Sequence, residues 1–400
     1  MRVLILGGAG MMGSGTARDL LAPYSRPMDV VIVADGAADR LDALRTSLPD
    51  ARLGTVHMDI TDDTALAGLL ADCDLCINAV PTYAGHQMRI FDACLAARRT
   101  YVDFGGMGVL TVQQKAKSAQ WEAAGATAVL GLGADPGLSN VICRAVADRL
   151  DRIDRINLYW AATLEGPENP VLVPPYAIST VLAEYGNASK QFLDGRLQEV
   201  PARSGEEVID LPAPWGPTRF MYSQHSEPLT VPFAHGIADK GIREFTWKLH
   251  LPEREHEAWL GLVKAGFGDF ATPVTLRDGT TVSPLAVLEA VIDRNMKANA
   301  ASIPQQDSHE IHFAVGHGLS GGRPTKVTCR VEGHPHPLYD GYVDAATSMN
   351  MSIAVQWILS HPKVPGVWGP EEYLDVEDYL ADLNRRHFTV EVEVTTTETL

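Results

Sequence analysis

The glycines near the start of the chain have the spacing of a phosphate-binding turn. An apolar run from Val3 to Leu6 leads into Gly7-Gly8-Ala9-Gly10-Met11-Met12-Gly13, and a helical pattern follows at once. In a G-x-G-x-x-G turn the first glycine permits the tight turn, the second lets backbone amides approach a pyrophosphate, and the third lets the helix pack closely on the strand. The helix N-terminus adds unpaired N–H groups and a partial positive charge. We assign to a dinucleotide site Gly8, Gly10, Met11, Met12 and Gly13.

A carboxylate at the end of the second apolar run bears on the choice of nicotinamide cofactor. Asp35 ends the run Val-Ile-Val-Ala-Asp. A carboxylate at this position accepts hydrogen bonds from both adenosine ribose hydroxyls and repels a 2'-phosphate, so the sequence predicts NAD rather than NADP. Arg40, on the following helix, could instead pair with that phosphate, and NADP therefore stays open. Asp35 could also simply cap the next helix.

Residues at the ends of the later apolar runs extend the predicted cofactor site. Asp59 follows the third strand and is a candidate for the adenine edge, although it could equally cap the helix that begins near Asp62. In doubly wound sheets, ligands bind at the carboxyl ends of the strands. The fourth and fifth strands should therefore meet the cofactor where they end. We assign to the cofactor Asp59, Asn78, Ala79, Val80, Pro81 and Gly105.

These residues need a parallel sheet to bring them together, and the first 130 residues have the pattern of one. Short apolar runs alternate with segments of helical periodicity. Strands that are apolar on both faces and interleaved with helices predict an α/β Rossmann domain with a doubly wound parallel sheet. The predicted strands include Val3 to Leu6, Val30 to Val33, Leu75 to Val80, Tyr101 to Val102 and Ala128 to Leu130.

Beyond Gly137 the pattern changes to longer alternating runs. Ile153 to Trp160, Gly241 to Leu251, His309 to Gly316 and Lys326 to Val331 alternate at period two. Alternation indicates strands with one wet face, and we therefore expect a second domain of α+β type with a largely antiparallel sheet.

A chain of 400 residues is longer than one hydrophobic core usually supports. We predict a Rossmann domain at 1–135, a substrate-binding and catalytic domain at 136–343, and a segment at 344–400 that returns toward the first domain. This last segment holds an apolar helix at Ala345 to Leu359 and a strand at Phe388 to Val394.

The composition excludes several classes of partner. The formal net charge of −17 opposes binding to nucleic acid and to anionic lipid. No stretch holds eighteen uncharged apolar residues and no signal-like segment opens the chain, so we expect a cytoplasmic protein without membrane contact. We expect a homo-oligomer, such as a homodimer, that acts on a small molecule.

Cysteine and histidine spacing gives little support for a metal site. Cys73 and Cys76 form a C-x-x-C that would suit half a zinc site or a redox pair, but no second pair accompanies it, and we interpret it as the start of a buried strand. His317, His334 and His336 have no acidic residue at ligand spacing. We predict no metal.

Five segments, in this order and spacing, resemble the saccharopine dehydrogenase family. They are Gly8 to Gly13, Asp35, Ile77 to Pro81, Tyr101 to Gly106 and Gly133 to Ser139. Three further segments are most similar to its lysine 6-dehydrogenase branch, namely Tyr176 to Tyr185, Phe192 to Pro201 and Ala345 to Leu359.

The resemblance implies hydride transfer between a nicotinamide and a carbon bonded to an amino nitrogen. In the segment that matches the family's D-P-G turn, Asp135 is the candidate to hold a substrate ammonium group and move its proton, unless it only caps the helix near Leu138. Asp103 would lie near the nicotinamide, or in an interdomain turn. The lysine that saccharopine-forming relatives have before the fifth strand is replaced by Arg98-Arg99, which cannot act as a general acid in the usual pH range.

The second domain supplies the other candidate site residues. His225 could relay protons near neutral pH, although a structural role is the more common one for a lone loop histidine. Lys240 and Arg243 could bind a substrate carboxylate or lie in a solvated turn. We assign to the substrate Tyr83, Tyr222, Lys240 and Arg243.

Together these observations predict an NAD(P)-dependent oxidoreductase acting on the CH–NH2 or CH–NH group of an amino acid or amine, with lysine oxidised at its terminal amine as the best single substrate. A saccharopine-, opine- or carboxynorspermidine-type imine reductase is the enzymatic alternative. A dinucleotide-binding sensor without turnover is the alternative from another class.

Overall fold

The early apolar runs form the predicted parallel sheet. In the computed structural model, which describes residues 1–105 and 107–398, seven strands lie in the order β17-β6-β5-β4-β1-β2-β3, and every pair is parallel. The strand order reverses at β1, which pairs with both β2 and β4. In doubly wound sheets this reversal marks the ligand-binding crevice. The strands are β1 (Arg2–Leu6), β2 (Val30–Asp35), β3 (Leu53–His57), β4 (Leu75–Asn78), β5 (Thr100–Asp103), β6 (Thr127–Val129) and β17 (Gly366–Trp368).

Helices connect these strands as the periodicity predicts. Asp62 caps one of them, α3, by accepting hydrogen bonds from the amides of Thr64 and Ala65. The connecting helices are α1 (Met11–Leu21), α2 (Ala38–Ser47), α3 (Asp63–Ala71), α4 (Gln87–Ala97), α5 (Val109–Lys115) and α6 (Ser118–Ala124). The Rossmann architecture of the first domain is therefore confirmed.

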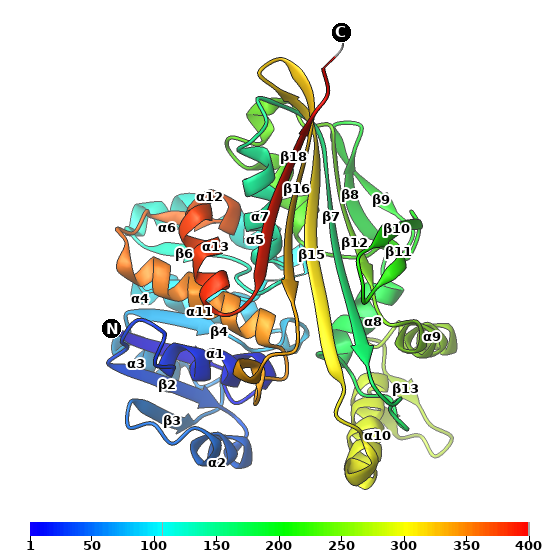
Figure 1. The fold of residues 1–400 in the computed structure, drawn as a ribbon. Coiled ribbons are helices and arrows are strands. Elements are labelled where there is room, and N and C mark those ends of the chain that lie inside the picture. Colours follow the sequence, from blue (N-terminus) through cyan, green and yellow to red (C-terminus); the bar gives the residue numbers. More distant parts are fainter. Residues whose placement is uncertain (106, 399–400) are drawn as a thin grey trace.

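The second sheet has nine strands and is mixed rather than purely antiparallel. Its path is β10-β11-β12-β7-β15-β16-β18, with β8 and β9 attached to β12, and only the pair β12–β7 is parallel. Figure 1 shows its long central strands side by side. The strands are β7 (Arg152–Glu165), β8 (Ser189–Leu193), β9 (Arg196–Val200), β10 (Glu207–Leu211), β11 (Gly216–Tyr222), β12 (Glu244–His250), β15 (Asp307–Ser320), β16 (Arg323–Gly333) and β18 (Thr389–Thr396).

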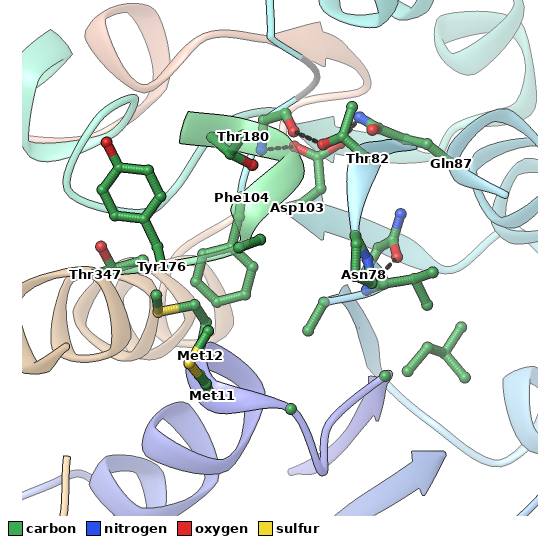
Figure 2. Close-up of a pocket in the computed structure, with 18 of the residues that line it drawn as sticks. Met11, Met12, Asn78, Thr82, Gln87, Asp103, Phe104, Tyr176, Thr180 and Thr347 are labelled. Atoms are coloured by element: carbon green, nitrogen blue, oxygen red, sulfur yellow. Dashed lines mark hydrogen bonds between the residues drawn. The ribbon is translucent and has the colours of Figure 1, made fainter. Parts of the chain in front are cut away.

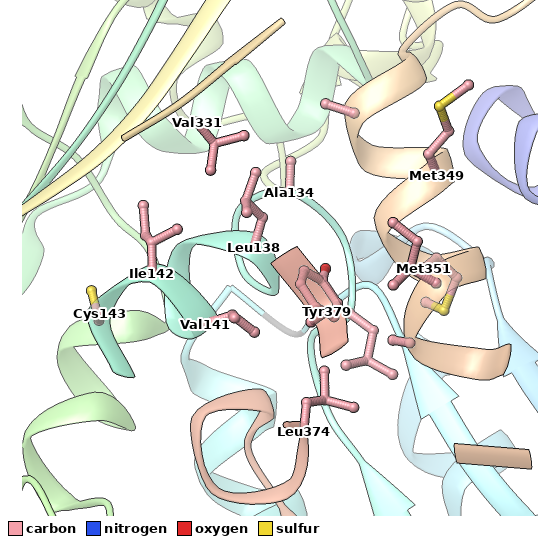
Figure 3. Close-up of a cluster of buried hydrophobic side chains, with 14 of the residues drawn as sticks. Ala134, Leu138, Val141, Ile142, Cys143, Val331, Met349, Met351, Leu374 and Tyr379 are labelled. Atoms are coloured by element: carbon pink, nitrogen blue, oxygen red, sulfur yellow. The ribbon is translucent and has the colours of Figure 1, made fainter. Parts of the chain in front are cut away.

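One buried helix packs between the second sheet and the C-terminal helices. The helix α7 (Leu138–Ala147) is buried along most of its length and packs against β15 and β16 on one side. Its other side contacts α12 (Pro370–Tyr373) and α13 (Val376–Arg385), and Figure 3 shows Tyr379 and Leu374 beside it. A second domain of α+β type, with an apolar layer between the sheets, is therefore confirmed.

The C-terminal segment contacts both sheets. The helix α11 (Ala345–Ser360) packs on α1 so closely that a Cβ on Gly15 would lie 2.3 Å from the Ser348 Oγ. The hydroxyl of Ser348 also donates to the carbonyl of Met12, 3.2 Å away. After α12 (Pro370–Tyr373) and α13 (Val376–Arg385), β18 pairs with β16. The division at 135 and 343 stays our working description of the domains.

The remaining helices and a short hairpin lie near one end of the second sheet (Figure 1). They are α8 (Ile178–Gly186), α9 (Glu253–Leu262), the hairpin β13 (Val274–Thr275) and β14 (Thr281–Val282), and α10 (Pro284–Ala298). Among the helices of the described residues, none is both long enough and apolar enough to cross a bilayer.

Candidate functional site

A cavity of about 800 Å³ opens where the parallel strands end. Its lining comes from the carboxyl ends of β1, β2, β4 and β5, and also from the second domain. In Figure 2, Asn78 and Asp103 from the first sheet face the same hollow as Tyr176 and Thr180 from the second domain. This volume lies within the usual range for small-molecule and cofactor sites.

The glycine turn has the close packing that its spacing predicts. A Cβ on Gly13 would lie 2.6 Å from the Cα of Gly8, and a Cβ on Gly8 would lie 2.8 Å from the Val33 Cγ1. The helix α1 begins at Met11 with no side-chain cap and no acidic residue in its first turn. Because Gly10, Met11 and Met12 line the cavity, the helix N-terminus presents its amides there, as a pyrophosphate requires.

The carboxylate of Asp35 is fixed at the end of β2. Its Oδ2 accepts a hydrogen bond from the amide of Ala9 (3.0 Å) and its Oδ1 accepts one from that of Ala37 (2.9 Å). Each carboxylate oxygen keeps a second lone pair, which suits ribose hydroxyls. Arg40 and His57 line the same cavity and could approach a 2'-phosphate.

We expect Asp35→Ala to weaken NAD binding by about 10- to 100-fold, because hydrogen bonds to a charged acceptor contribute about 1.5–3 kcal/mol. NADP binding should change much less, since the same substitution also removes the charge that repels a 2'-phosphate. Fluorescence titration with the two reduced cofactors measures both affinities. Asp39→Ala, an exposed carboxylate on α2, is the matched control. An equal loss for both cofactors would exclude Asp35 from the ribose site.

Two of the predicted cofactor residues form local structure at strand ends. The Asp59 Oδ1 accepts hydrogen bonds from the amide and hydroxyl of Thr61, both at 2.8 Å. The Asn78 side chain donates to the Tyr101 hydroxyl (3.0 Å) and accepts from the amide of Val80 (3.1 Å). Both residues line the cavity together with Ala79, Val80, Pro81 and Gly105.

Asp103 is a buried acceptor for five donors. Its Oδ2 accepts from Gln87, Tyr101 and Gln114 at 2.8–3.1 Å, and its Oδ1 accepts from the amides of Gly105 (3.0 Å) and Gly131 (2.8 Å). Burial raises the pKa of this carboxyl. Since its acceptor positions are occupied, Asp103 has little capacity left for a substrate proton. We interpret it as the residue that holds the loops after β5 and β6 in place.

Asp135 lies beside a histidine that the sequence did not single out. The His312 Nε2 lies 2.6 Å from the Asp135 Oδ2, and the two side chains are 2% and 10% exposed. Burial by itself lowers the pKa of His312, but the Asp135 carboxylate outweighs it, and the pKa is raised. The N-cap residue of α7 is Gly137, whose amide donates to the Asn140 Oδ1 at 3.0 Å, and the amides of Leu138 and Ser139 donate to the carbonyls of Gly133 and Ala134. Asp135 is therefore not needed as the cap.

Two further carboxyl groups border this pair. Glu310 and Asp344 line the cavity. Burial, with the charge of Asp344 close by, raises the pKa of Glu310 to about 7. Burial also raises the pKa of Asp344, which caps α11 by accepting from the amide of Thr347. A cation entering this part of the cavity would stabilise the ionised carboxylates.

His225 lies between two glutamates and against an indole. Its Nδ1 is 2.8 Å from the Glu227 Oε2 and its Nε2 is 3.6 Å from the Glu184 Oε1. The ring stacks on that of Trp247, with centroids 4.0 Å apart. Burial lowers the pKa of His225, but Glu227 and Glu184 more than compensate and raise it to about 10. At neutral pH the imidazole is thus already protonated, which argues against the predicted proton relay and for a positioning role.

The four residues predicted for the substrate are not among those that line the cavity. The Tyr222 ring lies under the Lys248 Nζ, 4.9 Å from its centroid. The Lys240 Nζ donates to the carbonyl of Ala147, and the Arg243 carbonyl accepts from the amide of Gly195. The Tyr83 ring contacts that of Phe270, 5.3 Å away. We therefore leave these four outside the proposed substrate site.

Several residues that line the cavity or contact its lining were missed by sequence reasoning. Glu310 and His312 occupy alternate positions of β15, so both point to one face of the sheet. These two titratable side chains on one face of a strand were the available signal. The Tyr176 hydroxyl donates to the Glu184 Oε2 at 2.5 Å. The sequence around these two residues gives no sign that they line a cavity rather than pack in the core.

The fold and this cavity define a dinucleotide-binding protein of the Rossmann type, with a second α+β domain over the cofactor-binding edge. The sequence matches the saccharopine dehydrogenase NADP binding domain at residues 3–129 and the saccharopine dehydrogenase C-terminal domain at residues 133–388. The chain belongs to the saccharopine dehydrogenase family. A nicotinamide dinucleotide, NAD or NADP, is thus its cofactor, as predicted.

Similar proteins have two different names. Carboxynorspermidine synthase of Vibrio alginolyticus is 27% identical over 62% of this chain and 60% of its own length. Saccharopine dehydrogenase [NADP(+), L-glutamate-forming] of Saccharomyces cerevisiae is 26% identical over 40% of this chain and 36% of its own. The chain thus spans less than two thirds of the length of these curated relatives. None of them is a lysine 6-dehydrogenase, and that branch stays a prediction.

A solved structure supports the fold along the whole chain. Apo saccharopine dehydrogenase (L-Glu forming) from Saccharomyces cerevisiae superposes with a TM-score of 0.70 at 15% identity, over 98% of this chain and 99% of that one. At this identity the likeness shows that both proteins share the arrangement of the two domains.

Proposed function

We propose that this chain is an NAD(P)-dependent oxidoreductase that acts on the CH–NH2 or CH–NH group of a substrate with a free ammonium group. The observation that carries the proposal is the cluster of carboxyl groups around His312, formed by Asp135, Glu310 and Asp344, which all line the cavity. Arg40 on α2 is the single Arg or Lys among the described residues that line the cavity. It lies in the part of the cavity that contains Asp35, at the predicted ribose position. Such a lining favours a cationic amine.

Asp135 has the free acceptor that binding an ammonium group requires. Its Oδ2 faces His312, whereas its Oδ1 is buried and, in the described part of the chain, has no hydrogen-bond partner. A buried carboxylate oxygen without a partner costs free energy that a substrate N–H would offset. The bound nicotinamide would exchange a hydride with the substrate carbon.

The chain's own residues would then handle the proton. In the oxidative direction, the Asp135 carboxylate, beside the His312 imidazole, first takes a proton from the substrate ammonium group. The nitrogen lone pair set free in this way forms the carbon–nitrogen double bond while the C–H electron pair leaves as hydride, and the product is a protonated imine. Phe104, Trp160 and Tyr176 line the same space and would limit the access of water.

Two substrate classes fit this proposal. Lysine, oxidised at its terminal amine, is the class that we predict from the sequence. The relatives named carboxynorspermidine synthase favour the alternative of imine reduction to a secondary amine. A saccharopine-type product carries several carboxylates, and a lining rich in carboxyl groups is less suited to it.

The test is the change in absorbance of the nicotinamide. The purified protein, with NAD and NADP in turn, is given lysine, diamines and polyamines, with matched hydroxy acids as the control. We expect reduction with at least one amine and none with hydroxy acids. If oxidation fails, reduced cofactor is supplied with an aldehyde and a diamine. If the protein binds the cofactor but shows no turnover in either direction, the alternative of a dinucleotide-binding sensor is favoured instead.

A further inference from the structure

Two histidines face each other on the side of the second sheet away from the cavity. Side chains alternate along β15, so His309 points to the face opposite Glu310. His334 follows β16 at the position that continues the register of Glu310 with Gly333. The two Nδ1 atoms lie 3.1 Å apart. The side chain of His309 is 14% exposed and that of His334 is 41% exposed.

A glutamate holds the other ring nitrogen of each histidine. The His309 Nε2 lies 3.2 Å from the Glu165 Oε2, and the His334 Nε2 lies 3.0 Å from the Glu332 Oε2. The Glu332 carboxylate is in turn paired with the Arg330 Nε, 2.8 Å away. An ionised carboxylate only accepts hydrogen bonds, so both Nε2 atoms carry the hydrogen.

This arrangement leaves the two Nδ1 lone pairs in conflict. A neutral imidazole has a single N–H, and here it is used at Nε2 in both rings. Two lone pairs at 3.1 Å repel each other unless a cation lies between them. Only a shared proton or a metal ion is small enough to bridge them.

We propose that His309 and His334 bind a divalent late transition metal ion, of the class of Zn²⁺, Cu²⁺ or Ni²⁺, through their Nδ1 atoms. Imidazole is a favoured ligand of these ions. With metal–nitrogen bonds of about 2.0–2.1 Å, the separation corresponds to an N–metal–N angle of about 100°, near tetrahedral. Glu165 and Glu332 are then the outer carboxylates that metal-binding histidines almost always have.

The site differs from a structural zinc site in having two protein ligands. Among the residues that the structure describes, no group of three or more His, Cys, Asp and Glu side chains could hold a metal ion. Water would complete the coordination, and the exposure of His334 gives the ion access. This proposal departs from our sequence-based prediction that the chain binds no metal, and it does not depend on the proposed function.

The test uses the full chain purified without a histidine tag. Isothermal titration with Zn²⁺ measures affinity, and titration with Cu²⁺ measures quenching of Trp215, whose ring centroid lies 6.2 Å from that of His309 and 6.4 Å from that of His334. We expect one saturable site. His309→Asn and His334→Asn should each lower the affinity at least 100-fold, and Glu332→Gln by about 10- to 100-fold. Trp215→Phe should remove the quenched signal but keep the heat of binding.

His317→Asn is the matched control, since His317 lies on the same strand and the same face as His309. Its affinity for the metal should equal that of the unchanged chain. Near-ultraviolet circular dichroism shows that each variant keeps the fold. The proposal would be overturned if His309→Asn and the unchanged chain bound Zn²⁺ with equal affinity. It would also be overturned if titration found no saturable site and ¹⁵N NMR spectra showed that the two rings share a single proton.

Discussion

Asp135→Asn is expected to lower the turnover of an amine substrate by about 10²- to 10⁴-fold, the usual contribution of a general acid or base. The substitution keeps the size of the side chain but removes the charge that faces a substrate ammonium group and His312. It also removes the carboxylate oxygen that could take the proton. Because Asp135 does not cap α7, the helix should form as before.

Steady-state rates with the best amine, and cofactor titration by fluorescence, test this expectation together. The affinity for reduced nicotinamide should change by less than about threefold. Asp148→Asn, on a carboxylate that pairs with Arg144 after the end of α7, is the control and should retain full activity. Turnover within threefold of the unchanged chain would remove Asp135 from the proton pathway, even if the amine proves to be the correct substrate.

The parallel sheet was predictable because each of its early strands is a short apolar run between helices. The edge strand β17 was not, since Gly366–Trp368 has no pattern of its own. It is a strand only because it pairs with β6, far away in the sequence. The same limit applies to β12, whose alternation indicates a strand but not that it runs parallel to β7.

The cofactor half of the site was more accessible to sequence reasoning than the substrate half. The glycine turn and Asp35 are adjacent to strands whose ends must meet, so a local motif locates them. His312 comes to Asp135 across 177 positions of sequence only because β15 packs against α7, the helix that follows Asp135. Lys240 and Arg243 had suitable chemistry, but neither lines the cavity. Residue type without position could not show whether either side chain reaches the cavity.

A buried ion pair between the ends of the chain provides the prediction with the largest effect on stability. Arg386, after α13, donates to both carboxylate oxygens of Asp19 on α1, at 2.8–3.1 Å. The two side chains are 2% and 0% exposed. The guanidinium also lies over the Tyr24 ring and donates to the Ser25 hydroxyl.

Arg386→Met should therefore lower the free energy of unfolding by about 3–5 kcal/mol, because it leaves the Asp19 charge buried and unpaired. Asp19→Asn should have a cost of similar size, whereas the double variant Asp19→Leu with Arg386→Met should cost much less than the sum. Unfolding in urea, followed by circular dichroism, measures all three. The neighbouring Arg385, whose side chain is 61% exposed and pairs with the partly buried Asp382, is the control, and its replacement by Met should cost about 0–1 kcal/mol. Equal effects at positions 385 and 386 would mean that the buried pair does not hold the C-terminal segment to the first domain. If the expected difference is found, the segment at 344–400 contributes to the stability of the cofactor domain. The reason is that Arg386, near the end of the chain, neutralises the charge of Asp19 on α1, the helix that follows the glycine turn.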